Sequence, residues 1–361
     1  MKGVILAGGL GTRLRPLTHT GAKQLIPIAN KPVIEYCIED LVRCRISEIA
    51  IIVGYTPERI QSVRETLGDG ERWGIRLKYV EQDAPRGIAH ALSVAENFVG
   101  DDACVLYLGD NLFQDDISPI IKKFHEQKVD LGLVLTQVDD PRPYGVAVID
   151  KTGRMIDIIE KPEQPPSNLV VTGVYYFSEK VFPIIQTLNP SGRGEYEISD
   201  TIHAMIKSPS TQFSSEEIGG WWDDTGTADA ILIANHKILT NITSNNYGTI
   251  EDNVKIIGAV SIGRNTRILQ GTVIRGPVII GDDCIIGPCY IGPYTSIGPR
   301  TVIQGGEIES TIIISDTTIH IGPAHRIIDS LIGRHTRIRT SAHLSPSGTR
   351  LVIGENSEVY L

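Results

Sequence analysis

The stretch GVILAGGLGTRLRP, residues 3–16, begins with a short apolar run that leads into three glycines and two arginines. An uninterrupted apolar run of this length is typical of a buried β-strand. Glycines and arginines directly after a strand favour an anion site, because glycine N–H groups can close around phosphate oxygens and arginine adds a charged, forked donor. A tight strand-to-helix turn with solvated arginines would use the same residues, so the motif alone leaves both interpretations open.

Strand-like and helix-like patterns alternate along the first two-thirds of the chain. Strand patterns lie at 2–7, 48–55, 75–82 and 103–110, and helical patterns lie at 33–46, 57–67 and 87–99. This alternation predicts a Rossmann-like α/β fold, with a mostly parallel sheet covered by helices. Four strand candidates then follow one another at 131–138, 144–150, 154–161 and 169–177, before helical patterns return at about 197–207 and 227–241. We therefore expect a mixed sheet with an added layer that walls one side of a cleft.

A different pattern occupies the last third of the chain. From about residue 250, isoleucine recurs roughly every six residues, at Ile262, Ile268, Ile274, Ile280, Ile286, Ile291, Ile297, Ile303, Ile308, Ile314, Ile321, Ile327, Ile332 and Ile338. A six-residue period suits a triangular β-solenoid, in which three hexads make one coil and each side points one isoleucine inward. We expect five or six coils, with the glycines that follow many of these isoleucines forming the sharp corners.

Composition limits the classes of partner. Among 361 residues, 34 are Lys or Arg and 43 are Asp or Glu, which gives a net charge of −9. We expect no nucleic-acid partner and no membrane partner, because an acidic protein repels both surfaces and because no apolar run approaches the length of a membrane span. The start MKGVILA is too short for a secretory segment, and five cysteines without a CxxC pair suggest buried thiols. We expect a cytoplasmic protein.

Two neighbouring motifs together carry a family resemblance. The glycine motif lacks the GK[ST] ending of a Walker loop and fails GxGxxG, because Leu14 stands where the third glycine belongs. With KQLIPIANKP at 23–32, it resembles the sugar nucleotidyltransferases, which join a nucleoside triphosphate to a sugar 1-phosphate. The resemblance continues in the family's order through LGDN at 108–111, YGV at 144–146, EKP at 160–162, VTGVYYF at 171–177, GRGEYEISD at 192–200 and WDDTGT at 222–227.

The resemblance implies a two-domain architecture. Residues 1–243 would form the nucleotidyltransferase domain, and residues 244–361 would form a left-handed parallel β-helix like that of hexapeptide-repeat domains. Flat β-helix faces suit self-association, so we expect a homo-oligomer. Some hexapeptide domains are acyltransferases with a catalytic histidine. We interpret His320, His325, His335 and His343 as coil-surface or turn residues and keep a bifunctional enzyme as the alternative.

The chemistry of this family sets the demands on the site. An oxygen of the sugar phosphate attacks the α-phosphorus of the triphosphate, and pyrophosphate leaves from the opposite side. Both reactants are polyanions, so the protein must mainly position them and neutralise charge. Mg²⁺ takes carboxylate ligands, and Asp110 ends a predicted strand, where ligands of open α/β sheets bind. The resemblance implies that Asp110 and Asp224 hold Mg²⁺, with Asp223 as the neighbouring candidate.

The resemblance also implies roles for the other site residues. Arg13 would stabilise the leaving pyrophosphate and Lys23 would bridge the phosphates as a point charge, so Arg13, Lys23 and Asp110 form the expected catalytic set. Arg15 is expected to be solvated or structural. The expected nucleotide-binding residues are Gly8, Gly9, Gln24, Gln82 and Gly87. The expected sugar-phosphate residues are Asn111, Gly145, Glu160, Lys161, Val171 and Arg193, with Glu195 and Glu197 as further candidates. Arg86 departs from the apolar residue expected near the base.

The motifs resemble most closely the family members that transfer a thymidylyl group. This resemblance, carried by KQL at 23–25 and GRGEYEISD at 192–200, implies that dTTP and α-D-glucose 1-phosphate react to give dTDP-glucose and pyrophosphate, with Mg²⁺ as cofactor. The alternatives are another base or sugar, such as UTP or N-acetylglucosamine 1-phosphate, and a non-enzymatic regulatory subunit. The charged residues Arg13, Lys23, Asp110 and Asp224 are all present, which argues against the subunit.

Overall fold

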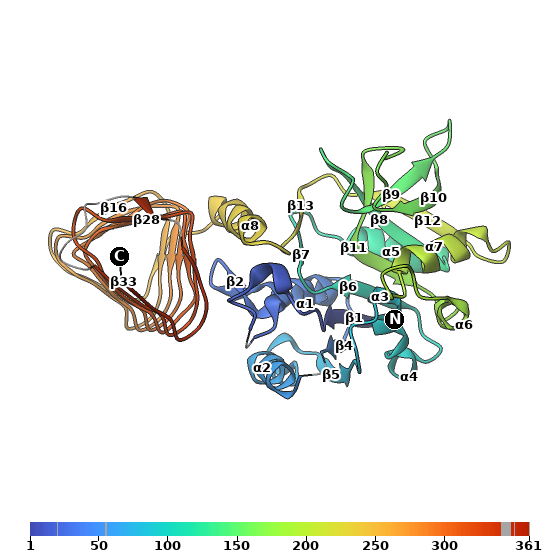
Figure 1. Cartoon of the computed structure of the whole chain (residues 1–361), viewed down its shortest axis with the longest axis horizontal. Coiled ribbons are helices and arrows are strands. Elements are labelled where there is room, and N and C mark those ends of the chain that lie inside the picture. Colours follow the sequence, from blue (N-terminus) through green and yellow to red (C-terminus); the bar gives the residue numbers. More distant parts are fainter. Residues whose placement is uncertain (20, 55, 341–347, 350, 361) are drawn as a thin grey trace. The chain divides into compact units, whose positions relative to one another are not determined.

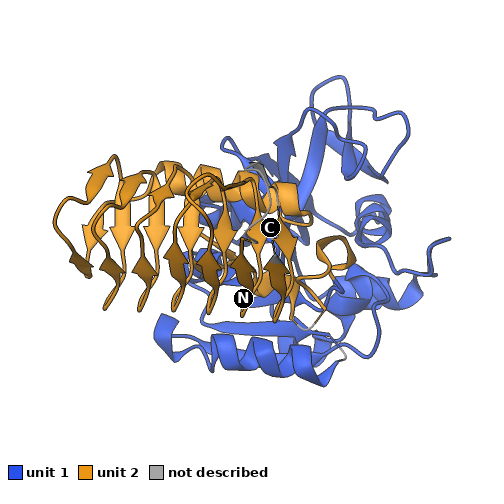
Figure 2. Ribbon diagram, turned by 60° about the vertical axis from the view of Figure 1, so that its left-hand side comes forward, with its two compact units in different colours: residues 1–10, 34–224 blue, residues 11–33, 225–361 orange. Residues whose placement is uncertain are grey.

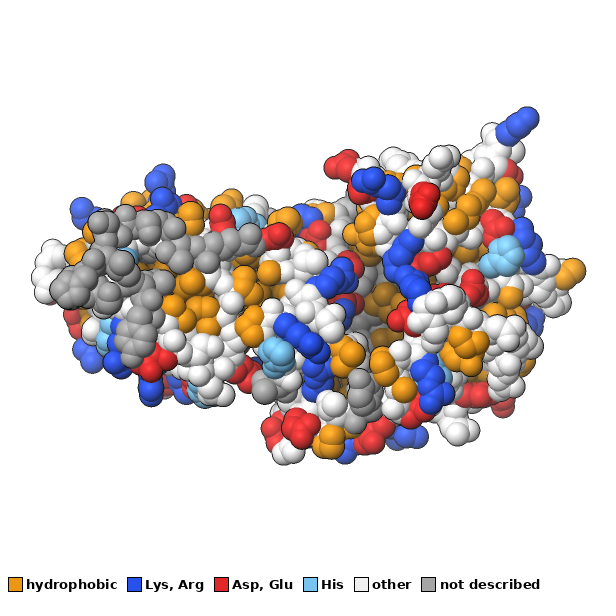
Figure 3. All heavy atoms as spheres, in the orientation of Figure 1, with side chains coloured by type: hydrophobic (Ala, Val, Ile, Leu, Met, Phe, Trp, Pro, Cys, Tyr) orange, Lys and Arg blue, Asp and Glu red, His pale blue; other side chains and the backbone are white. Residues whose placement is uncertain are grey.

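The computed structural model describes residues 1–19, 21–54, 56–340, 348–349 and 351–360. The chain forms two compact units (Figure 2): Met1–Leu10 with Ile34–Asp224, and Gly11–Val33 with Thr225–Leu361. Within the described part of the chain, no helix combines the length and the apolar character that a bilayer crossing requires. Basic and acidic side chains are interspersed on the face shown in Figure 3, so the described residues of this face form no single large acidic patch.

A nine-stranded sheet forms the centre of the first unit. Strands β5, β4, β1 and β6 run parallel in that order. Beyond β6, strand β11 pairs antiparallel with β6, β8 and β9, β9 pairs antiparallel with β10, and β12 runs parallel to β8. The predicted mixed sheet is confirmed. Its strands are β1 (Lys2–Ala7), β4 (Glu48–Val53), β5 (Arg76–Glu81), β6 (Cys104–Leu108), β8 (Leu131–Gln137), β9 (Gly145–Ile149), β10 (Met155–Glu160), β11 (Leu169–Phe177) and β12 (Phe213–Glu217).

Helices pack around this sheet (Figure 1). They are α1 (Val33–Arg43), α2 (Pro57–Leu67), α3 (Ile88–Ser93), α4 (Glu96–Val99), α5 (Ser118–Gln127), α6 (Val181–Thr187) and α7 (Ile198–Lys207), with the short 3-10 helix η3 (Glu71–Trp73). The single helix expected at 87–99 is two helices, because Ala95 N–H bonds to the carbonyl of Leu92, three residues back, at 2.9 Å. The sequence patterns did not predict α5 and α6.

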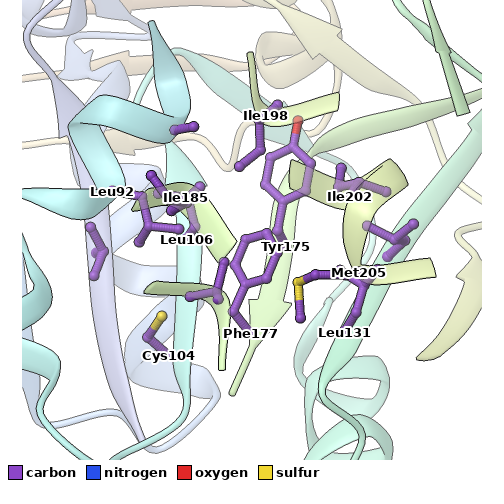
Figure 4. Close-up of a cluster of buried hydrophobic side chains, with 14 of the residues drawn as sticks. Leu92, Cys104, Leu106, Leu131, Tyr175, Phe177, Ile185, Ile198, Ile202 and Met205 are labelled. Atoms are coloured by element: carbon purple, nitrogen blue, oxygen red, sulfur yellow. The ribbon is translucent and has the colours of Figure 1, made fainter. Parts of the chain in front are cut away.

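A cluster of buried side chains fixes β11 within the sheet (Figure 4). The rings of Tyr175 and Phe177 stack with centroids 6.0 Å apart. The same cluster contains Leu106 of β6 and Ile202 and Met205 of α7. Because β11 is anchored by this core and paired on both edges, the loops at its ends are held in place relative to β6 and β9.

The second unit contains a left-handed parallel β-helix, as predicted. Its coils form three parallel sheets, two with seven described strands and one with six. The first sheet has β14 (Asn245–Asn246), β17 (Val260–Ile262), β20 (Val278–Ile280), β23 (Thr295–Ile297), β26 (Ile312–Ile313), β29 (Leu331–Ile332) and β32 (Val352–Ile353). The second has β15 (Thr249–Ile250), β18 (Arg267–Ile268), β21 (Ile285–Ile286), β24 (Val302–Gln304), β27 (Thr318–His320), β30 (Arg337–Arg339) and β33 (Glu358–Tyr360). The third has β16 (Lys255–Ile257), β19 (Val273–Arg275), β22 (Tyr290–Ile291), β25 (Glu307–Glu309), β28 (Arg326–Ile328) and β31 (Gly348–Thr349).

The inward isoleucines form ladders along the β-helix, and two of them differ from the prediction. One ladder runs through Ile262, Ile280, Ile297, Ile313 and Ile332. Ile313 therefore stands where the six-residue count placed Ile314, and Ile319 of the second sheet stands where it placed Ile321. The count failed because coil length varies: Ile297 and Ile313 pair after only 16 residues. Two of the sheets have seven strands, more than the expected five or six coils, because the repeat is longer than expected and extends from Asn245 of β14 to Tyr360 of β33.

Two of the glycines that follow the isoleucines, Gly281 and Gly298, serve close packing rather than corner geometry. A Cβ on Gly281 would lie 2.7 Å from the backbone N of Pro299, and one on Gly298 would lie 1.4 Å from the carbonyl oxygen of Ile314. The left-handed corner conformation falls two residues later, for example at Asp283 and Arg300. The expectation that these glycines form the corners is therefore wrong for Gly281 and Gly298.

The second unit also includes the segment Gly11–Val33 and helix α8 (Ala228–Thr240). That segment contains the 3-10 helices η1 (Thr12–Leu14) and η2 (Lys23–Leu25) and the paired strands β2 (Pro27–Ile28) and β3 (Lys31–Pro32). Thr227 caps α8, since its hydroxyl accepts from Ala230 N at 3.2 Å. The β-helix thus shares a compact unit with residues that the sequence assigns to the nucleotidyltransferase domain.

Candidate active site

The acidic candidate Asp110 lies two residues after the end of β6, in the turn beside the end of β1. Leu6 of β1 pairs with Leu108 of β6, and Gly109 N donates to the carbonyl of Leu6 at 3.1 Å. The Asp110 side chain is only 7% exposed, and Asn111 Nδ2 donates to its Oδ1 at 3.1 Å. The structure therefore places a buried, oriented carboxylate at the carboxyl ends of parallel strands, where ligands of open α/β sheets bind.

Asp224 lies across a short antiparallel ladder from this turn. Strand β7 (Asn111–Phe113) pairs with β13 (Trp222–Asp224), so that Asp224 is opposite Asn111 and Asp223 is opposite Leu112. Successive residues of a strand point to opposite faces, so Asp224 shares the face of Asn111 and Asp223 does not. Because the Asn111 side chain reaches the Asp110 carboxylate, this face is the one next to Asp110.

The side chain of Asn111 is held from several directions. Its Oδ1 accepts from Trp222 Nε1 at 2.7 Å and from Gly173 N at 3.1 Å. A Cβ on Gly173 would lie 2.3 Å from the same oxygen, so only glycine fits there. Asn111 is thus a buried link between β7, β11 and β13 that orients Asp110. Gly173 and Trp222 lie in the motifs VTGVYYF and WDDTGT, but the sequence did not predict this role for them.

Cys37 lies against the same turn as a neutral thiol. Its Sγ donates to the carbonyl of Asn111 at 3.4 Å. Burial raises the pKa of Cys37, and the charge of Asp110 raises it further. The thiol therefore stays protonated and acts as a weak hydrogen-bond donor.

The base-side candidate Gln82 follows β5 and is oriented by His90. Gln82 Nε2 lies 3.0 Å from His90 Nδ1, and His90 Nε2 lies 3.3 Å from Asp83 Oδ1. Burial lowers the pKa of His90, against the opposing effect of Asp83. In a neutral His90 with its proton on Nε2, the Nε2–H group points to the Asp83 carboxylate. The unprotonated Nδ1 then accepts a hydrogen bond from Gln82 Nε2. A Cβ on Gly8 would lie 2.9 Å from Gln82 Oε1, so that oxygen is directed at the end of β1.

His90→Phe tests this orientation. Loss of one orienting hydrogen bond is expected to raise the KM for the nucleoside triphosphate by about threefold to tenfold. Because the pKa of His90 is lowered, the wild-type KM should stay flat through the ordinary range of histidine titration and rise only at lower pH. Steady-state kinetics between pH 5 and 8 checks both results. A matched control is His125→Phe, which removes the contact of His125 with Tyr176. An unchanged triphosphate KM in His90→Phe contradicts the assignment.

Gly87 connects the base side to the segment predicted for the sugar side. Its φ of 99° suits glycine, and a Cβ there would lie 2.5 Å from the carbonyl oxygen of Tyr196. Tyr196 N donates to Arg86 O at 2.7 Å, and Ala89 N donates to Tyr196 O at 3.1 Å. Arg86, the unexpected residue here, pairs with Asp83. The loop before α3 and the segment 192–200 are therefore bonded to each other.

The predicted sugar-phosphate residues include an ion network at the ends of β9 and β10. Glu160 pairs in register with Gly145. Its Oε1 lies 3.3 Å from Lys161 Nζ and 3.5 Å from Arg193 Nη2, and the same guanidinium nitrogen lies 2.9 Å from Glu197 Oε1. The hydrogen bond to Glu197 raises the pKa of Arg193. This network offers both carboxylate acceptors and cations, the groups that a sugar phosphate requires.

Val171 and Glu195 are two further first-unit candidates for the sugar side. Val171 is a buried residue of β11, and Glu195 accepts a backbone hydrogen bond from Ser191. Tyr144, which precedes Gly145, packs edge-on against Trp222 with ring centroids 5.1 Å apart. Trp222 therefore contacts both the Asp110–Asn111 turn and the sugar-side loop. The sequence patterns did not predict this connection.

Arg13, Lys23 and Gln24 belong to the second unit. Arg13 is exposed in η1, as is Arg15 directly after it. Gly11 has a φ of 62°, its carbonyl accepts from Thr18 Oγ1 at 2.7 Å, and a Cβ on it would lie 3.1 Å from Lys23 Cβ. This packing places the stem of Lys23 against the glycine loop. Gln24 is only 2% exposed, and its Oε1 has no hydrogen-bond partner among the described residues.

The histidines of the β-helix divide by environment. His320 and His335 are exposed, the ring nitrogens of His325 are buried without a partner among the described residues, and His343 lies outside them. A cavity of about 910 Å³ on the β-helix is lined by His320 together with Cys289, Tyr290 and Gln304, among others.

Comparison with known proteins supports the resemblance. Residues 2–241 match the nucleotidyl transferase family, and residues 259–289 match the bacterial transferase hexapeptide (six repeats). A low-salt glycan biosynthesis nucleotidyltransferase, Agl11, from Haloferax volcanii is 41% identical over 100% of both chains. A glucose-1-phosphate thymidylyltransferase from Streptomyces antibioticus is 38% identical over 99% of both chains.

A solved structure supports the fold of the catalytic part. The crystal structure of a putative glucose-1-phosphate thymidylyltransferase from Bacillus anthracis, in complex with a sucrose, matches with a TM-score of 0.62 and 41% identity. The match covers 68% of this chain and 98% of that one. With the family match over most of the chain, the full-length relatives and the fold in agreement, the protein belongs to the nucleotidyl transferase family, as an enzyme with a C-terminal hexapeptide-repeat domain.

Proposed function

We propose that the protein transfers a thymidylyl group from dTTP to α-D-glucose 1-phosphate in a Mg²⁺-dependent reaction, releasing dTDP-glucose and pyrophosphate. The observation that supports this proposal is the β7–β13 ladder, in which Asp224 lies opposite Asn111, the residue that follows the buried Asp110. This arrangement occurs in a chain that aligns along almost its whole length with a relative named glucose-1-phosphate thymidylyltransferase.

The acidic residues fit Mg²⁺. This ion is usually held by one or two carboxylates, with water and substrate phosphate oxygens as its other ligands. Asp110 and Asp224 supply two carboxylates, whereas the described residues contain no group of three or more His, Cys, Asp or Glu side chains suited to a metal. When bound, Mg²⁺ neutralises negative charge on the phosphates. Asn111, Trp222 and Gly173 would keep the Asp110 carboxylate in place.

The chain's own cations would bind the triphosphate. Gly8 and Gly9 let the backbone approach the nucleotide, Lys23 contacts the phosphates as a point charge, and Arg13 stabilises the pyrophosphate as it leaves. The sugar phosphate is already ionised at neutral pH, so its oxygen attacks the α-phosphorus without a general base. The contribution of these residues is therefore alignment of the reactants and neutralisation of charge.

Gln82 would read the base. Its amide can pair with the edge of a pyrimidine, and His90 holds that amide in one orientation. Thymine and uracil present the same hydrogen-bonding edge, so Gln82 favours a pyrimidine without separating dTTP from UTP. The relative Agl11 is named a nucleotidyltransferase without a stated nucleotide, so it does not indicate which base is used. UTP is therefore the principal alternative donor.

The network around Glu160 would bind the sugar phosphate. Glu160 accepts hydrogen bonds from sugar hydroxyls, and Lys161 and Arg193 bind the phosphate. In this structure both cations lie within 3.5 Å of Glu160 Oε1, so the incoming phosphate would compete with that carboxylate for them. Gly145 and Val171 would shape the wall beside the sugar.

A substrate panel tests the proposal. All four deoxynucleoside triphosphates and UTP are combined with glucose 1-phosphate and N-acetylglucosamine 1-phosphate, and pyrophosphate release and product mass are measured with Mg²⁺ and with EDTA. We expect kcat/KM to be highest for dTTP with glucose 1-phosphate, by about tenfold over UTP, a typical discrimination for one small group in a pocket. Preference for another pair would replace the substrate assignment, and no pyrophosphate with any pair would contradict the activity. Release of CoA from acetyl-CoA, lost in His320→Ala, would support the bifunctional alternative.

A further inference from the structure

The turn between β2 and β3 has an unfavourable backbone. Pro27 pairs with Pro32 and Ile28 with Lys31, which leaves Ala29 and Asn30 as a two-residue turn. Their φ angles are 47° and 62°, so both residues are left-handed. Asparagine tolerates this conformation, but the Cβ of alanine opposes it. Contacts from outside the hairpin must therefore hold Ala29 in place.

Those contacts come from α8 and from one coil of the β-helix. Asn235 of α8 is fully buried, and its Oδ1 accepts from Ala29 N at 2.9 Å and from Ser296 Oγ at 2.7 Å. Its Nδ2 donates to the carbonyl of Tyr294 at 3.0 Å. Asn30 Nδ2 donates to the carbonyl of Ile297 at 2.7 Å. Both turn residues are thus bonded, directly or through Asn235, to the coil that contains β23.

The hairpin continues directly into the residues proposed to bind the triphosphate. Every residue from Gln24 to Ile28 is buried. Ile26 N donates to Lys23 O at 3.1 Å, and Val33 N donates to Ile26 O at 3.2 Å, which closes the base of the hairpin. Lys23 Cβ in turn packs against the Cα of Gly11, two residues before Arg13. A displacement of the turn would therefore be passed on to Lys23 and the glycine loop.

We propose that this coil of the β-helix holds the segment Gly11–Val33 in its triphosphate-binding conformation, with Asn235 and Asn30 as positioning residues. The inference rests on the proposed function, since it takes Arg13 and Lys23 to contact the triphosphate. The hexapeptide domain is then part of the machinery that sets nucleotide affinity. Without Asn235, the partly buried Ala29 N–H and Tyr294 carbonyl lose their partners, and the left-handed Ala29 loses the bond that stabilises it.

Two variants and a control separate positioning from general stability. Asn235→Ala removes the central amide. Asn30→Gly removes only the bond to Ile297, because glycine keeps the left-handed turn favourable. The control is His236→Ala: His236 stacks on Tyr294 with centroids 4.5 Å apart and lies 2.7 Å from Ser310 Oγ, so it anchors the same helix on the β-helix. The full-length proteins are compared by thermal unfolding, steady-state kinetics and hydrogen exchange.

The expected signature is a selective effect on the nucleotide. Asn235→Ala should raise the KM for dTTP about tenfold and Asn30→Gly about threefold, while the KM for glucose 1-phosphate changes less than about twofold. Amide exchange should accelerate in residues 11–33 in both variants. His236→Ala should keep the wild-type KM for both substrates.

Three results would overturn the proposal: wild-type dTTP KM in folded Asn235→Ala and Asn30→Gly, an equal rise in His236→Ala, or equal rises for both substrates. Should Asn235→Ala fail to fold, Asn30→Gly decides alone. Lys23→Ala is measured alongside to distinguish a failure of the proposed function from a failure of the proposed role of the β-helix. An unchanged dTTP KM in Lys23→Ala contradicts the proposed function, whereas a defective Lys23→Ala with normal asparagine variants contradicts only the role of the β-helix.

Discussion

Asp110→Asn is expected to reduce nucleotidyl transfer by about 10³-fold or more while the protein remains folded, because the change removes the charge that the metal and the transition state require. Asparagine has nearly the same shape, so the turn between β6 and β7 should persist. Pyrophosphate release at saturating dTTP, glucose 1-phosphate and Mg²⁺ measures the loss, and thermal unfolding verifies the fold. Near-normal activity of Asp110→Asn with Mg²⁺ would refute the metal assignment.

The two neighbouring aspartates provide an internal control for this experiment. Asp224 lies opposite Asn111 and Asp223 opposite Leu112, so their side chains point to opposite faces of the β7–β13 ladder. Asp224→Asn should therefore share the loss seen in Asp110→Asn, and Asp223→Asn should retain most activity. The reverse pattern would transfer the metal role to Asp223.

Arg13→Ala is expected to lower kcat by about 10²-fold, the scale of removing one preorganised charge contact from a developing anion. The guanidinium is exposed in η1, so its removal should leave the free energy of unfolding nearly unchanged. Single-turnover kinetics with dTTP and glucose 1-phosphate isolates the chemical step.

Arg15→Ala is the matched control for Arg13→Ala. Arg15 is also exposed and lies two residues away in the same loop. If Arg13 has the proposed role, Arg15→Ala should remain close to the wild-type kcat. An unchanged kcat in Arg13→Ala, or equal losses in both variants, would reduce Arg13 to a general contributor of positive charge.

The fold was predictable where one local pattern decides the structure. Strands β1 and β4 are parallel and mostly buried, and each is apolar after its first residue, so their sequences alone indicate them. The isoleucine repeat likewise predicts the β-helix. Local patterns failed where long-range packing decides: coil length varies, which moves Ile314 and Ile321 out of the ladders, and Gly281 and Gly298 are required by the next coil.

The site shows the same division. Motifs placed Asp110 and Gln82 at strand ends, which is where the structure has them. The partners that orient these residues come from distant parts of the chain: Trp222 holds Asn111 from 111 residues away, and Asn235 reaches Ala29 from 206 residues away. A single sequence contains no signal for such pairs, because each partner alone has the composition of an ordinary strand or helix residue.

The proposed reaction requires the triphosphate to bind at the glycine loop after β1. A crystal structure of the protein with dTTP and Mg²⁺ would show where the nucleotide binds. We expect triphosphate density against the loop from Gly8 to Arg13, with the metal at Asp110 and Asp224 and the base at Gln82. Nucleotide bound elsewhere on the protein, with that loop empty, would contradict it.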